Sequence, residues 1–220
     1  MPDSRLAAIF DCDGVLVDSE ALGREAWRMT FAEHGIALPP ARLLRLSGAA
    51  ADQVVRALLG RRRIDATREQ LKRRKLAIYL QLARRRLRTR SGARLLLARL
   101  RAGGWRLAVA SSGRKAKLRF NLSQTGLRCY FQVVVGIEAV ERGKPAPDLF
   151  LTAARRLGIG PERCLVFEDS PLGIAAGRAA GMKVVGVAGT FARPALRQAD
   201  WVVRDLSRLT PARLRSLLDQ

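Results

Sequence analysis

Short apolar runs rich in valine, leucine and isoleucine alternate with single helical patterns along most of this chain, so few topologies are open to it. The runs cover residues 6–10, 106–110, 132–135, 164–167, 183–187 and 201–203, and the helical patterns cover 93–102, 115–125, 147–157, 171–180 and 210–218. Gly126, Gly158 and Gly181 directly follow three of these patterns, where glycine commonly ends a helix. Strands separated by single helices predict an α/β fold whose parallel sheet is covered by helices on both faces.

Between residues 19 and 91 this alternation stops, and only helical periodicity remains. Leu76, Leu80, Ala83 and Leu87 are spaced by four, three and four residues, which places them on one face of a helix. We therefore expect an α/β core formed by residues 1–18 and 92–220, with a helical domain inserted at residues 19–91.

Two carboxylates one residue apart follow the first apolar run. Asp11 and Asp13 stand where the chain leaves a strand, and at the carboxyl edge of a parallel sheet both can reach the crevice in which such sheets bind ligands. Aspartate also occurs in ordinary turns, so the pair alone indicates little. Three later segments, at residues 109–112, 143–145 and 165–170, add small polar, cationic and acidic side chains beside strand ends. Together these residues can bind a phosphate dianion and a metal ion.

These four segments, in this order, resemble the signature motifs of the haloacid dehalogenase superfamily of phosphatases and mutases. The resemblance covers residues 6–189 and is strongest to the branch that contains β-phosphoglucomutase, phosphoglycolate phosphatase and sugar-phosphate phosphatases. It implies a Rossmann-like parallel sheet core with an inserted α-helical cap domain that acts as a lid. Hinges are then expected near residues 17–19 and 89–92.

The resemblance also implies roles for four side chains. Asp11 is the expected nucleophile, which forms an aspartyl-phosphate that water then hydrolyses. Asp13 is the expected general acid and base, and we expect burial and neighbouring carboxylates to raise its pKa so that it can donate a proton. Ser111 is expected to donate a hydrogen bond to the phosphoryl group, and Lys144 to offset charge between that group and the nucleophile.

A magnesium ion is the implied cofactor. The carboxylates of Asp11 and Asp169, with the backbone carbonyl of Asp13, are the expected ligands of a hard cation that prefers oxygen donors. Glu168 is expected in or just outside this ligand shell. The acidic pair could instead cap the following helix, where Ser170 fits the cap position, and both interpretations can hold together.

Further positions are expected to contact substrate. Backbone amides around Gly14 and Val15 are candidate phosphate donors, and Ser112 extends the donor set of the second motif. In the cap, alignment with the family places Lys75 on a lysine that contacts substrate, although a shift of one residue would place Arg74 there.

Two positions depart from the mutases of this branch. Gly23 stands where those enzymes carry a cap-hinge histidine, and Ala51 lies near the site of an arginine that holds a second phosphate. The only histidine, His34, lies near a helix end, where a surface position is expected. We therefore favour a Mg²⁺-dependent phosphatase that hydrolyses a sugar phosphate or a phosphorylated acid, with a phosphosugar mutase as the alternative.

The formal net charge of +22 is typical of proteins that bind nucleic acids, so a nucleic acid is a second candidate partner. Basic runs lie at residues 61–63, 72–75 and 84–86, but no aromatic residues interleave them as stacking platforms would. Solvated helix faces are therefore favoured over a nucleic-acid surface, and a basic nucleic-acid-binding protein on this fold is the less favoured alternative.

Cysteine usage and the N-terminal residues indicate the compartment. The three cysteines are widely spaced, which suggests neither a disulfide framework nor a zinc site. With no signal peptide and no apolar run long enough to span a bilayer, we expect a cytoplasmic protein with no membrane contact, present as a monomer or weak dimer.

Overall fold

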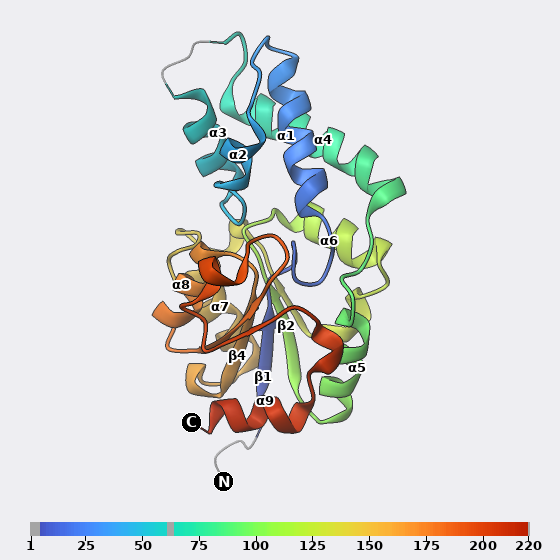
Figure 1. Ribbon diagram of the computed structural model, residues 1–220, viewed down its shortest axis with the longest axis vertical. Coiled ribbons are helices and arrows are strands. Elements are labelled where there is room, and N and C mark those ends of the chain that lie inside the picture. Colours follow the sequence, from blue (N-terminus) through green and yellow to red (C-terminus); the bar gives the residue numbers. More distant parts are fainter. Residues whose placement is uncertain (1–4, 61–63, 220) are drawn as a thin grey trace.

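The computed structural model describes residues 5–60 and 64–219. Within these residues six strands form one parallel sheet in the order β3-β2-β1-β4-β5-β6 (Figure 1). The strands are β1 (Ala7–Phe10), β2 (Arg106–Ala110), β3 (Val133–Val135), β4 (Cys164–Glu168), β5 (Lys183–Val187) and β6 (Trp201–Val203). The prediction of an α/β parallel sheet is confirmed, and each strand begins and ends within one residue of its expected position.

The register of the central strands brings the sequence motifs to one edge. Phe10, the last residue of β1, pairs with Val109 of β2 on one side and with Phe167 of β4 on the other. Because all three strands are parallel, the residues that follow them leave the sheet at the same end. Asp11 and the segments after β2 and β4 therefore lie close together.

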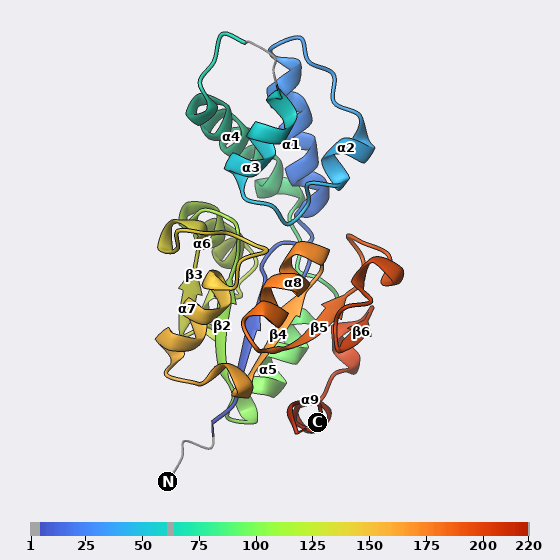
Figure 2. The same ribbon diagram turned by 90° about the vertical axis from the view of Figure 1, so that its left-hand side faces the viewer.

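Helices cover both faces of the sheet, with α7 (Asp148–Leu157) and α8 (Pro171–Ala179) on one side and α5 (Ala93–Ala102) and α6 (Lys115–Gln124) on the other (Figures 1 and 2). The helix α9 (Pro211–Leu218) joins the second side, since its Leu214 belongs to the same buried cluster as α5 and α6. Short 3-10 helices lie at η1 (Arg128–Tyr130), η2 (Ile137–Ala139), η3 (Pro161–Arg163), η4 (Arg193–Leu196) and η5 (Leu206–Arg208).

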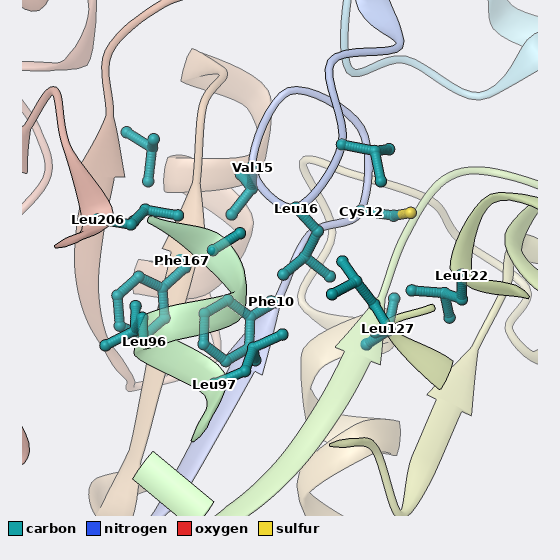
Figure 3. Close-up of a cluster of buried hydrophobic side chains, with 14 of the residues drawn as sticks. Phe10, Cys12, Val15, Leu16, Leu96, Leu97, Leu122, Leu127, Phe167 and Leu206 are labelled. Carbon is teal, nitrogen blue, oxygen red and sulfur yellow. The ribbon is translucent and has the colours of Figure 1, made fainter. Parts of the chain in front are cut away.

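Alternate residues of β1 belong to the two halves of the core. Ala7 and Ile9 pack with the α7 and α8 side chains, whereas Ala8 and Phe10 pack with those of α5 and α6. The ring of Phe10 stacks on that of Phe167 with centroids 4.4 Å apart, beside leucines of α5 (Figure 3). Burial on both faces explains why the strands read as continuous apolar runs.

Four helices of the inserted segment stack above the carboxyl edge of the sheet in the described part of the chain (Figure 1). They are α1 (Glu20–Ala32), α2 (Pro40–Leu44), α3 (Ala51–Leu59) and α4 (Arg68–Arg86). These helices share a separate apolar cluster that includes Trp27, Phe31, Val55, Leu58 and Leu71. We call residues 20–86 the helical insertion.

The two chain segments that connect the helical insertion to the sheet run side by side. A bridge joins Val17 to Thr89, the Asp18 amide donates to the Arg88 carbonyl at 2.9 Å, and the Arg90 amide donates to the Leu16 carbonyl at 2.9 Å. These residues coincide with the expected hinges. Hinge motion itself stays a prediction.

The C-terminal half of α4 packs onto the core of the sheet domain. Ala83 and Leu87 are buried in the cluster that contains Phe10, and Leu76 and Leu80 pack against it. The predicted apolar face of this helix is therefore confirmed.

Nowhere in residues 5–60 and 64–219 does a helix combine the length and the apolar character needed to cross a membrane.

Candidate active site

Five side chains with catalytic potential converge at the carboxyl edge of the sheet. Asp11 follows β1, Ser111 follows β2, Glu168 and Asp169 stand at the end of β4, and Lys144 comes from the loop before α7. All five are buried, although four of them are charged in water. Charged groups are rarely buried without a functional or pairing reason.

Lys144 supplies positive charge at the centre of this group. Its Nζ lies 2.5 Å from Asp11 Oδ1 and also forms an ion pair with Glu168, and only 1% of its side chain is exposed. Burial alone lowers the pKa of a lysine, but the two carboxylates outweigh burial and raise the pKa of Lys144. The lysine is therefore a fixed cation beside the expected nucleophile.

Glu168 braces the turn that presents Asp169. Its Oε2 accepts hydrogen bonds from the backbone amides of Asp169 and Ser170, at 2.8 and 2.9 Å, and from Ser170 Oγ at 3.0 Å. Ser170 in turn caps α8 by accepting from the Gly173 amide at 3.1 Å. Ser170 thus occupies the cap position expected for it, while Glu168 binds the turn before the helix, and direct ligation of a metal by Glu168 stays a prediction.

Asp169 has an unused carboxylate oxygen. Its Oδ2 is buried and has no hydrogen-bond partner among the residues that the structure describes. Gly14, which has a φ of 76°, passes so close that a Cβ at this position would overlap Asp169 Oδ2 and lie 2.7 Å from Thr190 Oγ1. Burial raises the pKa of Asp169 well above its usual value, and it raises that of Asp11 to about 7 even though Lys144 opposes the shift. Within the described parts of the chain, the buried cluster thus holds three carboxyl groups, those of Asp11, Glu168 and Asp169, but only one ammonium group, that of Lys144.

These features fit a hard divalent cation. The orphaned oxygen of Asp169 and the buried carboxylate of Asp11 are oxygen donors of the kind Mg²⁺ prefers, and a cation between them would stabilise their ionised forms against the effect of burial. No group of three or more His, Cys, Asp or Glu side chains within residues 5–60 and 64–219 is arranged to hold a metal alone. Such an ion would therefore also depend on backbone carbonyls, water and substrate, as Mg²⁺ commonly does.

The environment of Asp13 differs from the expectation. Lys117 Nζ lies 2.7 Å from Asp13 Oδ2, while Ser19 Oγ and Asn121 Nδ2 donate to Oδ1, the latter at 3.3 Å. Burial would raise the pKa of Asp13, but the adjacent ammonium and these hydrogen bonds outweigh burial and lower it. The prediction that the pKa of Asp13 is raised is therefore wrong. The physical reason is the ion pair with Lys117 on α6, which the sequence pattern does not indicate.

The predicted phosphate donors are used in different ways. The Gly14 amide donates to the Val17 carbonyl at 2.8 Å, so the turn itself uses it, and the Val15 side chain is buried in the core (Figure 3). The expected role of the Gly14 amide is therefore corrected, and this glycine instead allows the close approach of Asp169. Ser111 Oγ accepts from the Gly113 amide at 3.2 Å, and Ser112 Oγ is buried without a hydrogen-bond partner in the described part of the chain.

A cavity of about 190 Å³ lies between the helical insertion and the sheet edge. Asp11, Asp13, Ser111 and Ser112 form its floor. Basic side chains on its walls outnumber the acidic Glu20 and Glu69. The basic ones are Arg24, Lys72, Arg73, Lys75, Arg114 and Lys117, and the apolar ones are Trp27, Leu43, Leu46, Val54 and Leu76. A small anion with an uncharged body fits such a lining.

Lys75, rather than Arg74, faces the cavity. Its ammonium lies 5.3 Å from the ring centroids of both Trp27 and Tyr79, and burial together with Lys117 lowers its pKa to about 7. Arg74 points away and forms a two-pronged ion pair with Glu33 on an exposed surface. The one-residue ambiguity in the alignment is resolved in favour of Lys75, whose contact with substrate stays a prediction.

The two positions that depart from the mutases also border the cavity. Gly23 and Ala51 both line it, and a Cβ built on Gly23 would meet no atom within 4 Å. The space that a hinge histidine would fill is therefore open here. His34 follows α1 and does not line this cavity.

Comparisons with known proteins identify the family of this chain. The family described as haloacid dehalogenase-like hydrolase matches residues 6–181. The chain is 34% identical to fructose-1-phosphate phosphatase YqaB of Escherichia coli over 183 residues, which cover 81% of this chain and 94% of that protein. It is 33% identical to hexitol phosphatase A of Escherichia coli over 203 residues, which cover 92% of each chain.

The fold is also that of solved relatives. The structure of β-phosphoglucomutase from Clostridium difficile superimposes with a TM-score of 0.87 at 24% identity, covering 98% of this chain and 97% of the other. At that identity the likeness concerns the fold alone. The family match, the sequence relatives and the order of the four motifs together show that this chain belongs to the haloacid dehalogenase-like hydrolase family.

Proposed function

We propose that this protein is a Mg²⁺-dependent phosphatase that hydrolyses the phosphate monoester of a small sugar or sugar alcohol through an aspartyl-phosphate on Asp11. The observation that carries the proposal is the pairing of Asp11 with Lys144 in a buried cluster where Asp169 keeps a carboxylate oxygen unused. A nucleophile, a fixed cation and a cation-binding oxygen are the parts that phosphoryl transfer requires.

In the first step a carboxylate oxygen of Asp11 attacks phosphorus. The bond from Asp11 to phosphorus forms as the bond from phosphorus to the ester oxygen breaks, and the leaving oxygen takes a proton from Asp13. In the second step water attacks the phosphorus of the aspartyl-phosphate, gives its proton to Asp13 and releases inorganic phosphate. Lys144, held at 2.5 Å from Asp11, stabilises negative charge in both steps.

The cation would be held by Asp11, by Asp169 and by the backbone carbonyl of Asp13. It supplies charge neutralisation between the anionic nucleophile and the phosphate dianion. Ser111 and Ser112, which follow β2, would donate hydrogen bonds to phosphoryl oxygens, and their position in the cavity lining supports this role. The unpartnered hydroxyl of Ser112 supports that role.

Asp13 is held as an ionised group by Lys117, Ser19 and Asn121. In that form it is ready to accept a proton from the attacking water. To act as the acid in the first step it must first carry a proton, which becomes easier when bound substrate adds negative charge to the cavity.

The substrate class rests on the relatives and on the cavity. Two proteins that are at least 33% identical are named as phosphatases of fructose 1-phosphate and of hexitols. Basic side chains on the cavity walls favour an anionic substrate. A phosphosugar mutase is the second candidate, because the four motifs of this chain also resemble those of the mutases of this superfamily. Gly23 and Ala51 oppose it, since neither can hold the second phosphate of a bisphosphate intermediate.

A nucleic-acid surface is less well supported. Several cations of the basic runs are already paired with acids on exposed helix faces, as in the pairs of Arg74 with Glu33 and of Arg86 with Glu25. The run at residues 61–63 lies outside the described residues. Exposed ion pairs of this kind indicate solvated surfaces and add little to stability.

The test is a panel of phosphate monoesters, including fructose 1-phosphate, glucose 6-phosphate, sorbitol 6-phosphate and phosphoglycolate, assayed for inorganic phosphate. We expect release with Mg²⁺, loss of release in EDTA, and no release by Asp11→Asn. Full activity in EDTA after metal analysis confirms removal, or an active Asp11→Asn variant, would contradict the proposal.

A further inference from the structure

Three side chains from two separate segments of the chain hold Asp13. Ser19 comes from the connection to the helical insertion, whereas Lys117 and Asn121 lie one turn apart on α6, in the sheet domain. Residues four apart on a helix present their side chains on the same face, so both α6 residues reach the same carboxylate. Neither Lys117 nor Asn121 belongs to the four motifs.

A fourth residue, Tyr79, links this arrangement to the helical insertion. Tyr79 lies on α4 and is fully buried, and its hydroxyl donates to Asn121 Oδ1 at 2.8 Å. With its oxygen occupied in this way, the Asn121 amide must present Nδ2 to Asp13, where it donates at 3.3 Å. If the amide were reversed, its oxygen would face the Asp13 carboxylate, which only accepts, and the hydrogen bond to Asp13 would be lost.

Tyr79 also contacts Lys117 directly. The Lys117 ammonium lies 4.7 Å from the centroid of the Tyr79 ring, which is within the range of a cation–π interaction. Only 13% of the Lys117 side chain is exposed, so it has little freedom to leave this position. The ring and hydroxyl of Tyr79 thus fix both α6 partners of Asp13.

We propose that Lys117, with Asn121 and Tyr79, is a positioning residue that sets the orientation of the Asp13 carboxyl group, and that α4 of the helical insertion controls this orientation through Tyr79. The inference rests on the proposed function, in which Asp13 passes a proton to the leaving oxygen. Because Tyr79 and Asn121 belong to different parts of the molecule, proton delivery is aligned only when α4 is docked on α6.

The role of Lys117 can be separated from substrate binding through the leaving group. A sugar alkoxide is a poor leaving group and needs a well-placed proton donor, whereas 4-nitrophenolate leaves without one. Since kcat/KM reports the steps up to formation of the phosphoenzyme, a fault in proton delivery lowers it more for the sugar phosphate than for 4-nitrophenyl phosphate. A fault in phosphate binding lowers both values equally.

The experiment measures kcat/KM for a sugar phosphate that the wild type hydrolyses and for 4-nitrophenyl phosphate. The variants are Lys117→Met, Tyr79→Phe and Lys117→Arg, and Arg119→Met is the matched control. Arg119 is an exposed cation on the same helix and does not line the cavity. Tyr79→Phe keeps the ring and the net charge, so it tests the hydroxyl alone. Thermal unfolding confirms that each variant is folded.

For Lys117→Met and Tyr79→Phe we expect kcat/KM to fall about 10-fold further for the sugar phosphate than for 4-nitrophenyl phosphate, as part of the general acid contribution is lost. Lys117→Arg should recover part of the difference, and Arg119→Met should affect both esters equally. Equal losses for the two esters in both Lys117→Met and Tyr79→Phe would overturn the inference while leaving the phosphatase intact. A wild type that hydrolyses neither ester would overturn the proposed function as well.

Discussion

Gly48 of the helical insertion lies directly against Ser170 at the end of β4. A methyl group built on Gly48 would lie 2.6 Å from Ser170 Oγ and 2.9 Å from its Cβ, and the φ of Gly48 is 85°. The contact joins the loop before α3 to the residue that caps α8 and follows Asp169. The helical insertion therefore approaches the candidate metal-binding turn through a position that accepts only glycine.

Replacing Gly48 by alanine should separate the helical insertion from the sheet edge. We expect kcat/KM to fall on the order of 10-fold or more, because misplacement of about 1 Å has a large effect on positioned groups. The control is Gly35→Ala, since Gly35 has a φ of 69° but no atom within 4 Å of the added methyl group. Both variants carry backbone strain of about 1–2 kcal/mol, and only Gly48→Ala adds the collision with Ser170, so Gly35→Ala measures the effect of strain alone. A similar fall in kcat/KM for Gly35→Ala would show that strain, not the contact with Ser170, is responsible.

Replacing each aspartate of the first motif by asparagine should lower kcat to a different extent. Asp11→Asn should abolish turnover because the nucleophile is lost, and Asp13→Asn should lower kcat by orders of magnitude because proton transfer is lost. Steady-state kinetics with a hydrolysed ester measures both. If Asp11→Asn keeps more than about a tenth of the wild-type kcat, a change of only about 1.4 kcal/mol, the covalent mechanism is wrong.

The buried carboxylates should make stability depend on pH when no divalent cation is bound. The pKa of Asp11 is raised to about 7, and that of Asp169 is also raised. A raised carboxyl pKa means that the unfolded state releases its proton first, at about pH 3.9, so the contribution of these two groups to stability is greatest below that value and falls as the pH rises toward 7. Mg²⁺ should reverse this loss, so the increase in Tm on adding Mg²⁺ should be larger at about pH 7 than at about pH 5.

Asp169→Asn is the control for this prediction. The substitution replaces a buried carboxyl group that has no cationic partner in the described part of the chain with a neutral amide. In EDTA near pH 7 we therefore expect the variant to unfold at a higher temperature than the wild type. Its Tm should not respond to Mg²⁺. Equal increases in Tm for both proteins on adding Mg²⁺ would show that the cation binds elsewhere.

The net charge of +22 should affect the arrival of substrate more than its choice. Cations around a cleft raise the local concentration of a dianion, and salt screens this effect over about 8 Å at physiological ionic strength. Between about 50 and 500 mM NaCl, kcat/KM for an active ester should fall several-fold while kcat barely changes. Sub-micromolar binding of DNA or RNA at physiological salt would instead reveal a dedicated basic surface.

The sheet could be predicted from the sequence because strands buried on both faces read as uninterrupted apolar runs. The segment around Phe10 is one such run, and Gly158 and Gly181 mark helix ends that the structure retains. The approach of Asp11 to Lys144 followed from the motifs, since family resemblance relates residues that are distant in the chain. The cap position of Ser170 was also expected from the sequence, whereas the contacts of Glu168 with the backbone amides of Asp169 and Ser170 were not.

The contacts of Asp13 could not be predicted in the same way. Lys117 stands six residues after Ser111 in an ordinary basic helix, and nothing in its spacing marks it as a partner of Asp13. Its position depends on the rotation of α6 about its axis and on the packing of Tyr79 from α4, and both are set by tertiary contacts. Because Lys117 was missed, the direction of the Asp13 pKa shift was wrong. The use of the Gly14 amide within its own turn also depends on local geometry that residue types do not specify.

The central claim is that Asp11 becomes phosphorylated during turnover. The direct measurement mixes the enzyme with a hydrolysed phosphate ester and Mg²⁺, quenches it within milliseconds, reduces the acyl phosphate with borohydride and locates the modified residue by peptide mass spectrometry. With 4-nitrophenyl phosphate, whose leaving group needs no proton donor, Asp13→Asn should slow only hydrolysis of the intermediate and so increase the yield. We predict modification at Asp11 in both proteins and none in Asp11→Asn. Rapid phosphate release without any modified peptide, or modification at a different residue, would contradict the account.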